Sequence, residues 1–223
     1  PHYASARDVS EAERTDRRAA FGLEGCVFLY VGRLHPDKGV GHLLEAYRNL
    51  VEWGEEVSLL IAGDGPEEAA IKAFASSVPR VQMMGFVQAA QMPAVYALAD
   101  VFVFPTLGDP HGLVVEEAMA AGLPVISTAS AGDIRRRLPE GQAGYVVPPA
   151  DPAALAEAMR RLARDTALRS RQGGTAARLA ADRGHDRYAA DFERFVEATL
   201  ALPARSTPQA ALARIAGKGL SPL

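Results

Sequence analysis

Two cations and one carboxylate lie in loops that follow apolar segments of this sequence, and a second carboxylate lies about one turn inside the helix that follows. Asp109 and Glu117 are separated by seven residues within "DPHGLVVEE", and Arg33 and Lys38 lie within "VGRLHPDKGV". The backbone N–H groups of residues 112–114 fall at the N-terminus of the expected helix, where partial positive charge gathers. Cations and a helix N-terminus can bind a diphosphate, and carboxylates can accept hydrogen bonds from sugar hydroxyls.

Each of these residues also has an ordinary structural interpretation. Arg33 and Lys38 are equally compatible with a solvated surface loop, and His35 between them is taken as a bystander. An acidic residue in a first helical turn stabilises the helix by about 0.3–1 kcal/mol, which accounts for Glu116. Glu117 fits less well, because "LVVEEAMAAG" is otherwise apolar and a buried carboxylate without a partner is costly.

Two further loops follow apolar runs. "AGDGPEE" begins like a dinucleotide-binding fingerprint, but it lacks the third small residue and follows the second apolar run, so we interpret it as a tight turn. In "MGFV", Phe86 and Val87 could present a flat face and backbone groups to a nucleotide base. An ordinary strand end that packs into the core explains the same residues.

These loops must be positioned by alternating strands and helices. We expect strands at 26–32, 57–63, 81–87, 100–105, 123–128 and 143–149, and helices at 11–23, 38–54, 65–78, 91–99, 113–122, 151–165, 167–182 and 187–202. The strands are continuous apolar runs, which favours a parallel sheet buried on both faces. The pattern predicts an α/β, doubly wound, Rossmann-like domain with ligands at the carboxyl ends of the strands.

The totals exclude several classes of protein. The 223 residues carry a net charge of −3, which gives no reason to expect nucleic acid or an anionic membrane as a partner. One cysteine, Cys26, excludes an internal disulfide framework and suits a reducing compartment. No apolar run reaches about 18 residues, so no membrane-spanning helix is expected, and no signal peptide is recognisable.

Five motifs together resemble the carboxyl-terminal domain of retaining glycosyltransferases of family 4, the "group 1" transferases with the GT-B architecture. The motifs are "LYVGRLHPDKGVGHLLEAY", "LLIAGDGPE", "VQMMGFV", "YALADVFVFPT" and "DPHGLVVEEAMAAGLPVIST", in the family's order. The resemblance covers residues 21–200. It implies half of a two-domain enzyme, the half that binds a nucleotide-sugar donor.

The resemblance also implies residue roles. Arg33 and Lys38 would neutralise the donor diphosphate, Asp109 would face the transferred sugar, and Glu117 would hold the ribose hydroxyls. Of these residues, Arg33, Lys38 and Asp109 would act in catalysis. The full expected donor site is Gly32, Arg33, Lys38, Phe86, Val87, Asp109, His111, Gly112, Leu113, Val114 and Glu117. The donor would be a UDP-sugar, with GDP- and ADP-sugars as alternatives, and no metal or cofactor is expected.

The sequence departs from the family pattern at several positions. Asp109 replaces the usual glutamate and shortens the reach to the sugar, and His111 replaces the usual aromatic residue. In "SAGDIRRRLPEG", Ala131 stands at the first glycine and Arg135 at the acid of the usual Gly-Gly-x-Pro-Glu run. These changes bear on which sugar is used and on activity itself.

The resemblance implies a missing amino-terminal domain that carries the acceptor site. Residues 1–20 would be a linker from that domain, 21–185 the nucleotide-sugar-binding domain, 186–202 a helix packing toward the missing domain, and 203–223 a flexible tail. We therefore expect the isolated chain to be inactive, although the whole enzyme would transfer a hexose. The expected location is cytoplasmic, with any membrane contact made through the missing domain.

Two other functional interpretations stay open. The chain could be a non-catalytic nucleotide-binding or partner module that kept the fold. It could also belong to a related GT-B enzyme, such as a nucleotide-sugar epimerase or a phosphorylase. A phosphorylase would need a lysine for pyridoxal phosphate, and no lysine lies in a supporting motif.

Overall fold

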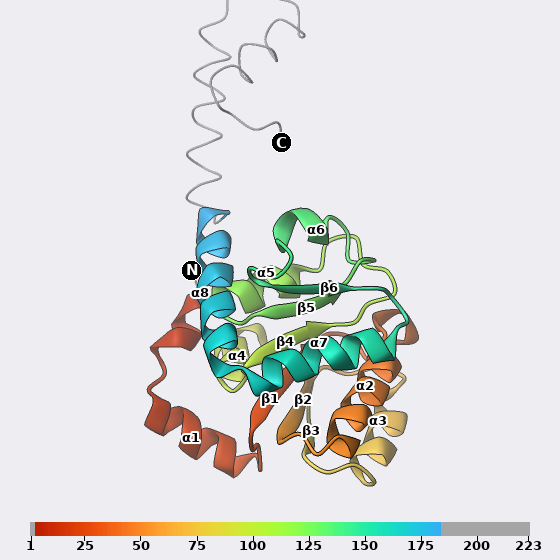
Figure 1. Ribbon diagram of the computed structural model, residues 1–223. Helices are drawn as coiled ribbons and strands as arrows, with labels where there is room; N and C mark the ends of the chain where they lie inside the picture. Colours follow the sequence, from red (N-terminus) through yellow and green to blue (C-terminus); the bar gives the residue numbers. More distant parts are fainter. Residues whose placement is uncertain (1–2, 184–223) are drawn as a thin grey trace, which may run out of the picture. The chain divides into compact units, whose positions relative to one another are not determined.

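The computed structural model describes residues 3–183, which form a six-stranded, wholly parallel sheet with helices on both faces (Figure 1). The strand order is β3-β2-β1-β4-β5-β6. The strands are β1 Cys26–Val31, β2 Val57–Ala62, β3 Val81–Gly85, β4 Val101–Phe104, β5 Val125–Thr128 and β6 Gly144–Val147. The predicted doubly wound, Rossmann-like α/β fold is confirmed.

The seven helices predicted within residues 3–183 are present close to their predicted ranges. The helices of the structure are η1 Tyr3–Asp8, α1 Glu11–Ala20, η2 Pro36–Lys38, α2 Val40–Glu52, α3 Glu68–Ala75, η3 Ala89–Gln91, α4 Met92–Ala97, α5 Leu113–Ala120, α6 Ile134–Arg137, α7 Pro152–Arg164 and α8 Thr166–Asp182. Of these, η1 and α6 were not predicted. The predicted cap of α7 is present, because the Asp151 carboxylate accepts the Ala154 N–H at 2.9 Å. Helix α3 begins at Glu68, later than the sequence suggested, because residues 65–67 form a turn.

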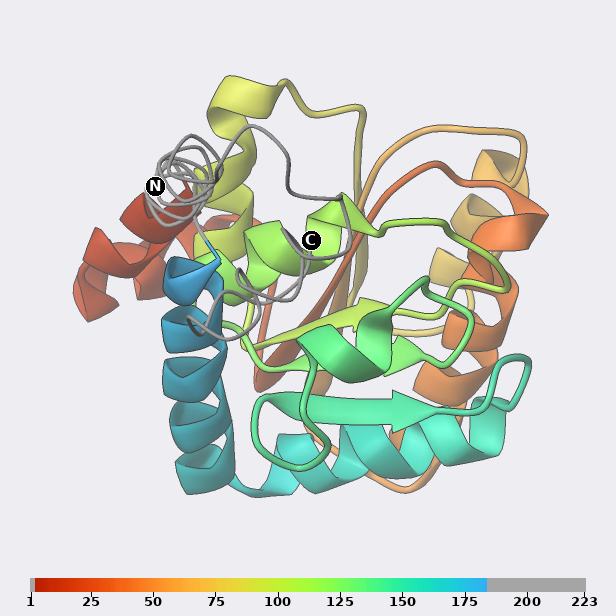
Figure 2. The ribbon, with the colours of Figure 1, turned by 90° about the horizontal axis from the view of Figure 1, so that it is seen from above.

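Alternate residues of each strand enter two separate cores, which explains the continuous apolar runs. In β1, Val27 and Leu29 pack on the face covered by α4 and α5, whereas Phe28 and Tyr30 pack on the face covered by α2, α3 and α7 (Figures 1 and 2). All four side chains are fully buried. A strand buried on both faces has no room for alternating polar residues.

The sheet changes direction of winding between β1 and β4, its two central strands. From β1 the order runs outward through β2 and β3, and from β4 it runs outward through β5 and β6. The loops that leave β1 and β4 therefore diverge to opposite faces of the sheet, and the space between the starts of these two loops is where a doubly wound fold is expected to have its ligand crevice. These are the loops that carry Arg33, Lys38 and Asp109.

The segment before β1 is folded onto the domain. Arg14 and Arg18 of α1 lie 2.7 Å and 2.9 Å from the two carboxylate oxygens of Asp100, and the Val27 N–H donates to the same carboxylate at 2.8 Å. Although burial favours the neutral form, the two arginines and this N–H lower the pKa of Asp100.

The assignment of residues 1–20 as an interdomain linker stays a prediction, as do the boundaries of the central domain. The proposed helix at 186–202 and tail at 203–223 lie outside the described residues.

Replacing Asp100 by alanine should destabilise the fold by about 3 kcal/mol, because it leaves two largely buried arginines without their shared carboxylate. Urea unfolding at pH 7 measures the change. The matched control is Glu13→Ala, which removes an exposed ion pair with Arg17 and should cost about 0.5 kcal/mol or less. Equal losses in the two variants would contradict the assigned role of Asp100.

The Asp100 contribution should also depend on pH. Because the folded pKa lies below the ordinary value of 3.8, this stabilisation is present above that value and is lost as the pH falls through it toward the folded pKa. The difference in unfolding free energy between wild type and Asp100→Ala should therefore shrink between about pH 5 and pH 3. A difference that stays constant over this range would show that the carboxylate charge does not hold α1.

Candidate functional site

The loops after β1 and β4 are locked together. The Asp37 carbonyl accepts the Leu107 N–H at 2.8 Å and the Thr106 hydroxyl at 3.2 Å. Gly39 has φ +68°, and a Cβ at this position would lie 2.1 Å from the Pro105 carbonyl oxygen, so only glycine fits. The two loops therefore hold Lys38 and Asp109 in a fixed relation.

Lys38 and Asp109 form an ion pair across the crevice. Lys38 Nζ lies 3.0 Å from Asp109 Oδ2, and each side chain is less than one-fifth exposed. The other oxygen, Oδ1, accepts the backbone N–H groups of His111 at 3.0 Å and Gly112 at 2.5 Å. Burial acts to raise the pKa of Asp109, but Lys38 and the two amides outweigh it and lower that pKa.

Helix α5 begins directly beside the ion pair of Lys38 and Asp109. Its N-cap is Gly112, in the left-handed region at φ +56°, and a Cβ there would lie 2.8 Å from the Phe104 ring. The N–H groups of Leu113 and Val114 lie in the first turn, where a helix leaves its amides without intrahelical acceptors. Asp109 therefore links Lys38 to the α5 N-terminus, because its carboxylate pairs with Lys38 and accepts the Gly112 N–H.

Glu117 lies one turn further into α5 and has partners that the sequence did not indicate. The Tyr96 hydroxyl donates to Glu117 Oε2 at 2.8 Å, and Tyr3 also hydrogen-bonds this carboxylate. Burial, followed by the Glu117 charge and its hydrogen bond, raises the pKa of Tyr96. The same causes raise the pKa of Tyr3 to about 12. The cost of a half-buried carboxylate is thus offset by two phenol donors.

The loops after β2 and β3 support the loop after β1. A Cβ on Gly63 would lie 1.9 Å from the Gly32 carbonyl oxygen, and the Gly63 N–H donates to the Gly85 carbonyl at 2.8 Å. The Leu34 N–H donates to the Asp64 carbonyl at 2.7 Å. The glycines of "AGDGPEE" therefore serve close packing of adjacent loops, in agreement with a tight turn.

The remaining predicted residues lie around this centre. Arg33 is exposed, and its carbonyl accepts the Tyr30 hydroxyl at 2.7 Å. Phe86 is 66% exposed and Val87 is half-buried, and both follow β3, which is two strands from β1. His111 is exposed in the turn before α5. The structure thus brings Lys38, Asp109 and the α5 N-terminus into contact and leaves the predicted base-binding pair at the edge strand.

The segment "SAGDIRRRLPEG", in which Ala131 and Arg135 differ from the pattern described above, packs against the Asp109 loop. Asp109 and Ala131 form an isolated parallel bridge, with the Asp109 N–H 3.3 Å from the Ser130 carbonyl oxygen. Ala131 is fully buried, and a Cβ on Gly132 would lie 2.4 Å from the Pro110 carbonyl oxygen. Arg135 is exposed in α6. Ala131, one of the residues that differ from the pattern, therefore helps to support the backbone of Asp109.

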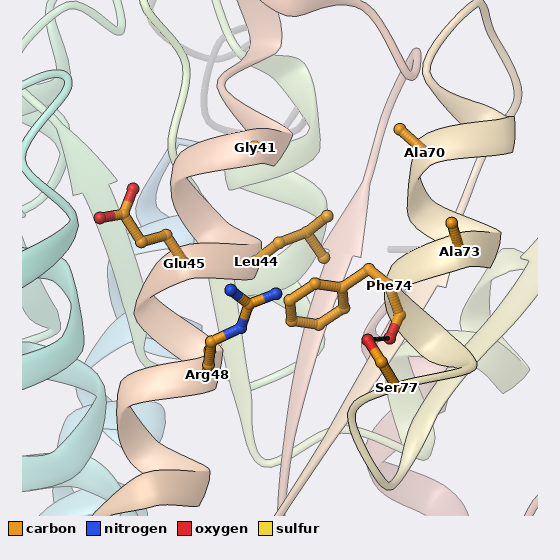
Figure 3. Close-up of a pocket in the computed structure, with 8 residues that line it drawn as sticks. All are labelled: Gly41, Leu44, Glu45, Arg48, Ala70, Ala73, Phe74 and Ser77. Atoms are coloured by element: carbon orange, nitrogen blue, oxygen red, sulfur yellow. Dashed lines mark hydrogen bonds between the residues drawn. The ribbon is translucent and has the colours of Figure 1, made fainter.

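A separate groove of about 580 Å³ lies between α2 and α3 (Figure 3). It is lined by Gly41, Leu44, Glu45, Arg48, Ala70, Ala73, Phe74 and Ser77. The Arg48 guanidinium lies 5.1 Å from the centroid of the Phe74 ring. None of the predicted donor-binding residues lines this groove, so it is distinct from the crevice between β1 and β4.

Two properties of residues 3–183 concern other kinds of site. Over this range, no three His, Cys, Asp or Glu side chains cluster closely enough to hold a metal ion. None of the helices in the same range has the length and hydropathy needed to cross a bilayer.

Comparisons with known proteins identify the family of this chain. The family model described as glycosyl transferases group 1 matches residues 25–165. The chain is 36% identical over 166 residues to the phosphatidyl-myo-inositol mannosyltransferase of Mycobacterium leprae, covering 74% of this chain and 44% of that protein. It is 32% identical over 176 residues to the alpha-D-kanosaminyltransferase of Streptomyces kanamyceticus, covering 77% and 45%. The chain thus spans less than half the length of these two curated relatives.

Solved structures share the fold. The C-terminal domain of the group 1 family protein LpcC from Francisella tularensis has a TM-score of 0.67 and 20% identity, with 80% of this chain covering 95% of that domain. Anabaena HepE, solved in complex with UDP and glucose, has a TM-score of 0.73 and 22% identity, covering 89% of this chain and 55% of that one. The family model, the curated relatives and the shared fold lead to one assignment: the chain belongs to the group 1 glycosyl transferases and has the fold of their C-terminal domain.

Proposed function

We propose that this chain is the donor-binding half of a retaining glycosyltransferase that transfers a hexose from a nucleotide-sugar. One observation carries the proposal: Lys38, Asp109 and the α5 N-terminus meet within hydrogen-bonding distance, with Glu117 one turn further along the same helix. A diphosphate needs cations and free amides, and a ribose needs a carboxylate close behind them. Lys38 and the α5 amides would contact the diphosphate, and Glu117, one turn further along the helix, would contact the ribose.

The proposed chemistry is stabilisation of a leaving group. As the bond between the sugar and the terminal phosphate breaks, negative charge grows on the diphosphate oxygen. Lys38, Arg33 and the N–H groups of Leu113 and Val114 would stabilise that charge. Asp109 would hold Lys38 and the start of α5 in place and face the transferred sugar. Gly32 and His111 would border the diphosphate and the sugar.

A UDP-sugar is the preferred donor within this proposal, with GDP- and ADP-sugars as alternatives. Anabaena HepE, which shares the fold, was solved with UDP and glucose bound, and this supports a uridine nucleotide by similarity of fold. Phe86 and Val87 would border the base. The acceptor would bind to an amino-terminal domain absent from this chain, and the whole protein would act in the cytoplasm without a metal or cofactor.

The test of this proposal is calorimetric titration of the chain with UDP, GDP and ADP. One nucleotide should bind saturably, and Glu117→Ala should weaken it by about 10-fold or more, because a hydrogen bond to a charged group contributes about 1.5–3 kcal/mol. The matched control is the neighbouring acid, Glu116→Ala, since Glu116 pairs with Arg137 at 3.5 Å. The control should bind like the wild type.

Two outcomes would contradict the proposal. Binding that Glu117→Ala leaves unchanged would place the nucleotide elsewhere. An absence of binding in this chain and in a longer protein that includes the amino-terminal domain would favour a non-catalytic partner module.

Replacing Lys38 by alanine should weaken the bound nucleoside diphosphate by about 10- to 100-fold, because one charge-assisted phosphate contact is lost. The affinity for the corresponding nucleoside, which lacks phosphate, should stay the same. Titration of both ligands measures the difference. The control is Lys72→Ala, an exposed lysine paired with Glu68 on α3. Equal losses for nucleoside and diphosphate would mean that Lys38 acts only by supporting the loops.

A further inference from the structure

Two tyrosines from distant parts of the chain converge on Glu117. Tyr96 lies on α4 and is 1% exposed, and its hydroxyl lies 2.8 Å from Glu117 Oε2. Tyr3, in η1, hydrogen-bonds the same carboxylate. The two rings are 5.6 Å apart with an interplanar angle of 89°, an edge-to-face arrangement. Each ring therefore restrains the other while both hydroxyls reach one carboxylate.

This arrangement fixes how Glu117 can bind a ligand. A carboxylate has about four acceptor positions, and the two phenols occupy some of them and set its orientation. Burial and the Glu117 charge raise the pKa of both phenols, so both stay protonated donors at neutral pH. The remaining acceptor positions suit neighbouring hydroxyl donors. The pair of adjacent hydroxyls in a nucleotide is the 2′,3′-diol of its ribose.

We propose that Tyr96 and Tyr3 are positioning residues that aim Glu117 at this diol and make the site select ribose over 2′-deoxyribose. This inference rests on the proposed function and deepens it. It also makes η1 part of the donor site, because Tyr3 belongs to the segment that precedes α1. The chain entering the domain thus contributes directly to nucleotide recognition.

The experiment is calorimetric titration of wild type, Tyr96→Phe and Tyr3→Phe with the nucleoside diphosphate that the wild type binds and with its 2′-deoxy form. The wild type should prefer the ribonucleotide by about 10-fold. Each phenylalanine variant should lose about 3- to 10-fold for the ribonucleotide and less than about 2-fold for the deoxy form. In the background of Glu117→Ala, Tyr96→Phe should have no further effect, as expected when one residue acts through another.

A matched control separates positioning from packing. Tyr47, on α2, is also a fully buried tyrosine, and its hydroxyl donates to the Val57 carbonyl at 3.0 Å, away from Glu117. Tyr47→Phe should leave both affinities unchanged. Thermal unfolding of the three variants establishes that each is folded at the titration temperature.

The outcomes distinguish this inference from the proposed function. If Tyr96→Phe weakens both nucleotides equally, or weakens neither, the positioning role is wrong while nucleotide binding stands. If the wild type binds the ribonucleotide and the deoxy form equally, the diol is not the group recognised and the inference fails. A wild type that binds no nucleotide, alone or in the longer protein, overturns the proposed function and this inference with it.

Discussion

The candidate site depends on one constraint, the interlocking of the loops that leave β1 and β4. Strand order makes these loops diverge to opposite faces of the sheet, and hydrogen bonds to the Asp37 carbonyl tie them together again. The contact is close enough that Gly39 tolerates no side chain against Pro105. As a result, a cation from one loop and a carboxylate from the other meet at 3.0 Å. The fold itself therefore holds Lys38 and Asp109 in a fixed relation, which would pre-organise the proposed site.

Asp109 contacts the same groups that a bound diphosphate would need. In the structure it neutralises Lys38 and accepts two amides at the start of α5. A diphosphate in the crevice would bind the same cation and the same end of the helix. The diphosphate would therefore share Lys38 with Asp109 or displace Asp109 from Lys38. The shorter aspartate, compared with the usual glutamate of the family, keeps the carboxylate within reach of its own loop. In this structure Asp109 thus helps to hold the β1 and β4 loops and the start of α5 together.

Local sequence patterns were sufficient to predict the framework of the fold. Continuous apolar runs predicted the strands, and signals such as Asp151 followed by Pro152 predicted where helices begin. The placement of the loops of Lys38 and Asp109 at the carboxyl ends of strands followed from the predicted parallel sheet, whereas the ion pair between the two residues was not predicted. Tyr96 and Tyr3 could not be found in this way, because each resembles an ordinary apolar residue of its own segment. Their role emerges only when segments about 20 and more than 100 residues from Glu117 in the chain are packed together.

Helix α4 connects the anchoring of the amino-terminal segment with the ordering of the site. Arg14 donates to the carbonyls of Ala97 and Ala99, and Arg18 donates to that of Leu98, so two arginines of α1 satisfy the carboxyl end of α4. The Asp100 carboxylate, which follows directly, binds the same two arginines. These contacts fix α4 at the end nearest Tyr96, and a hydroxyl can orient a carboxylate only if its own backbone is held. The amino-terminal segment therefore reaches Glu117 by two routes, directly through Tyr3 and indirectly through the arginines that hold α4.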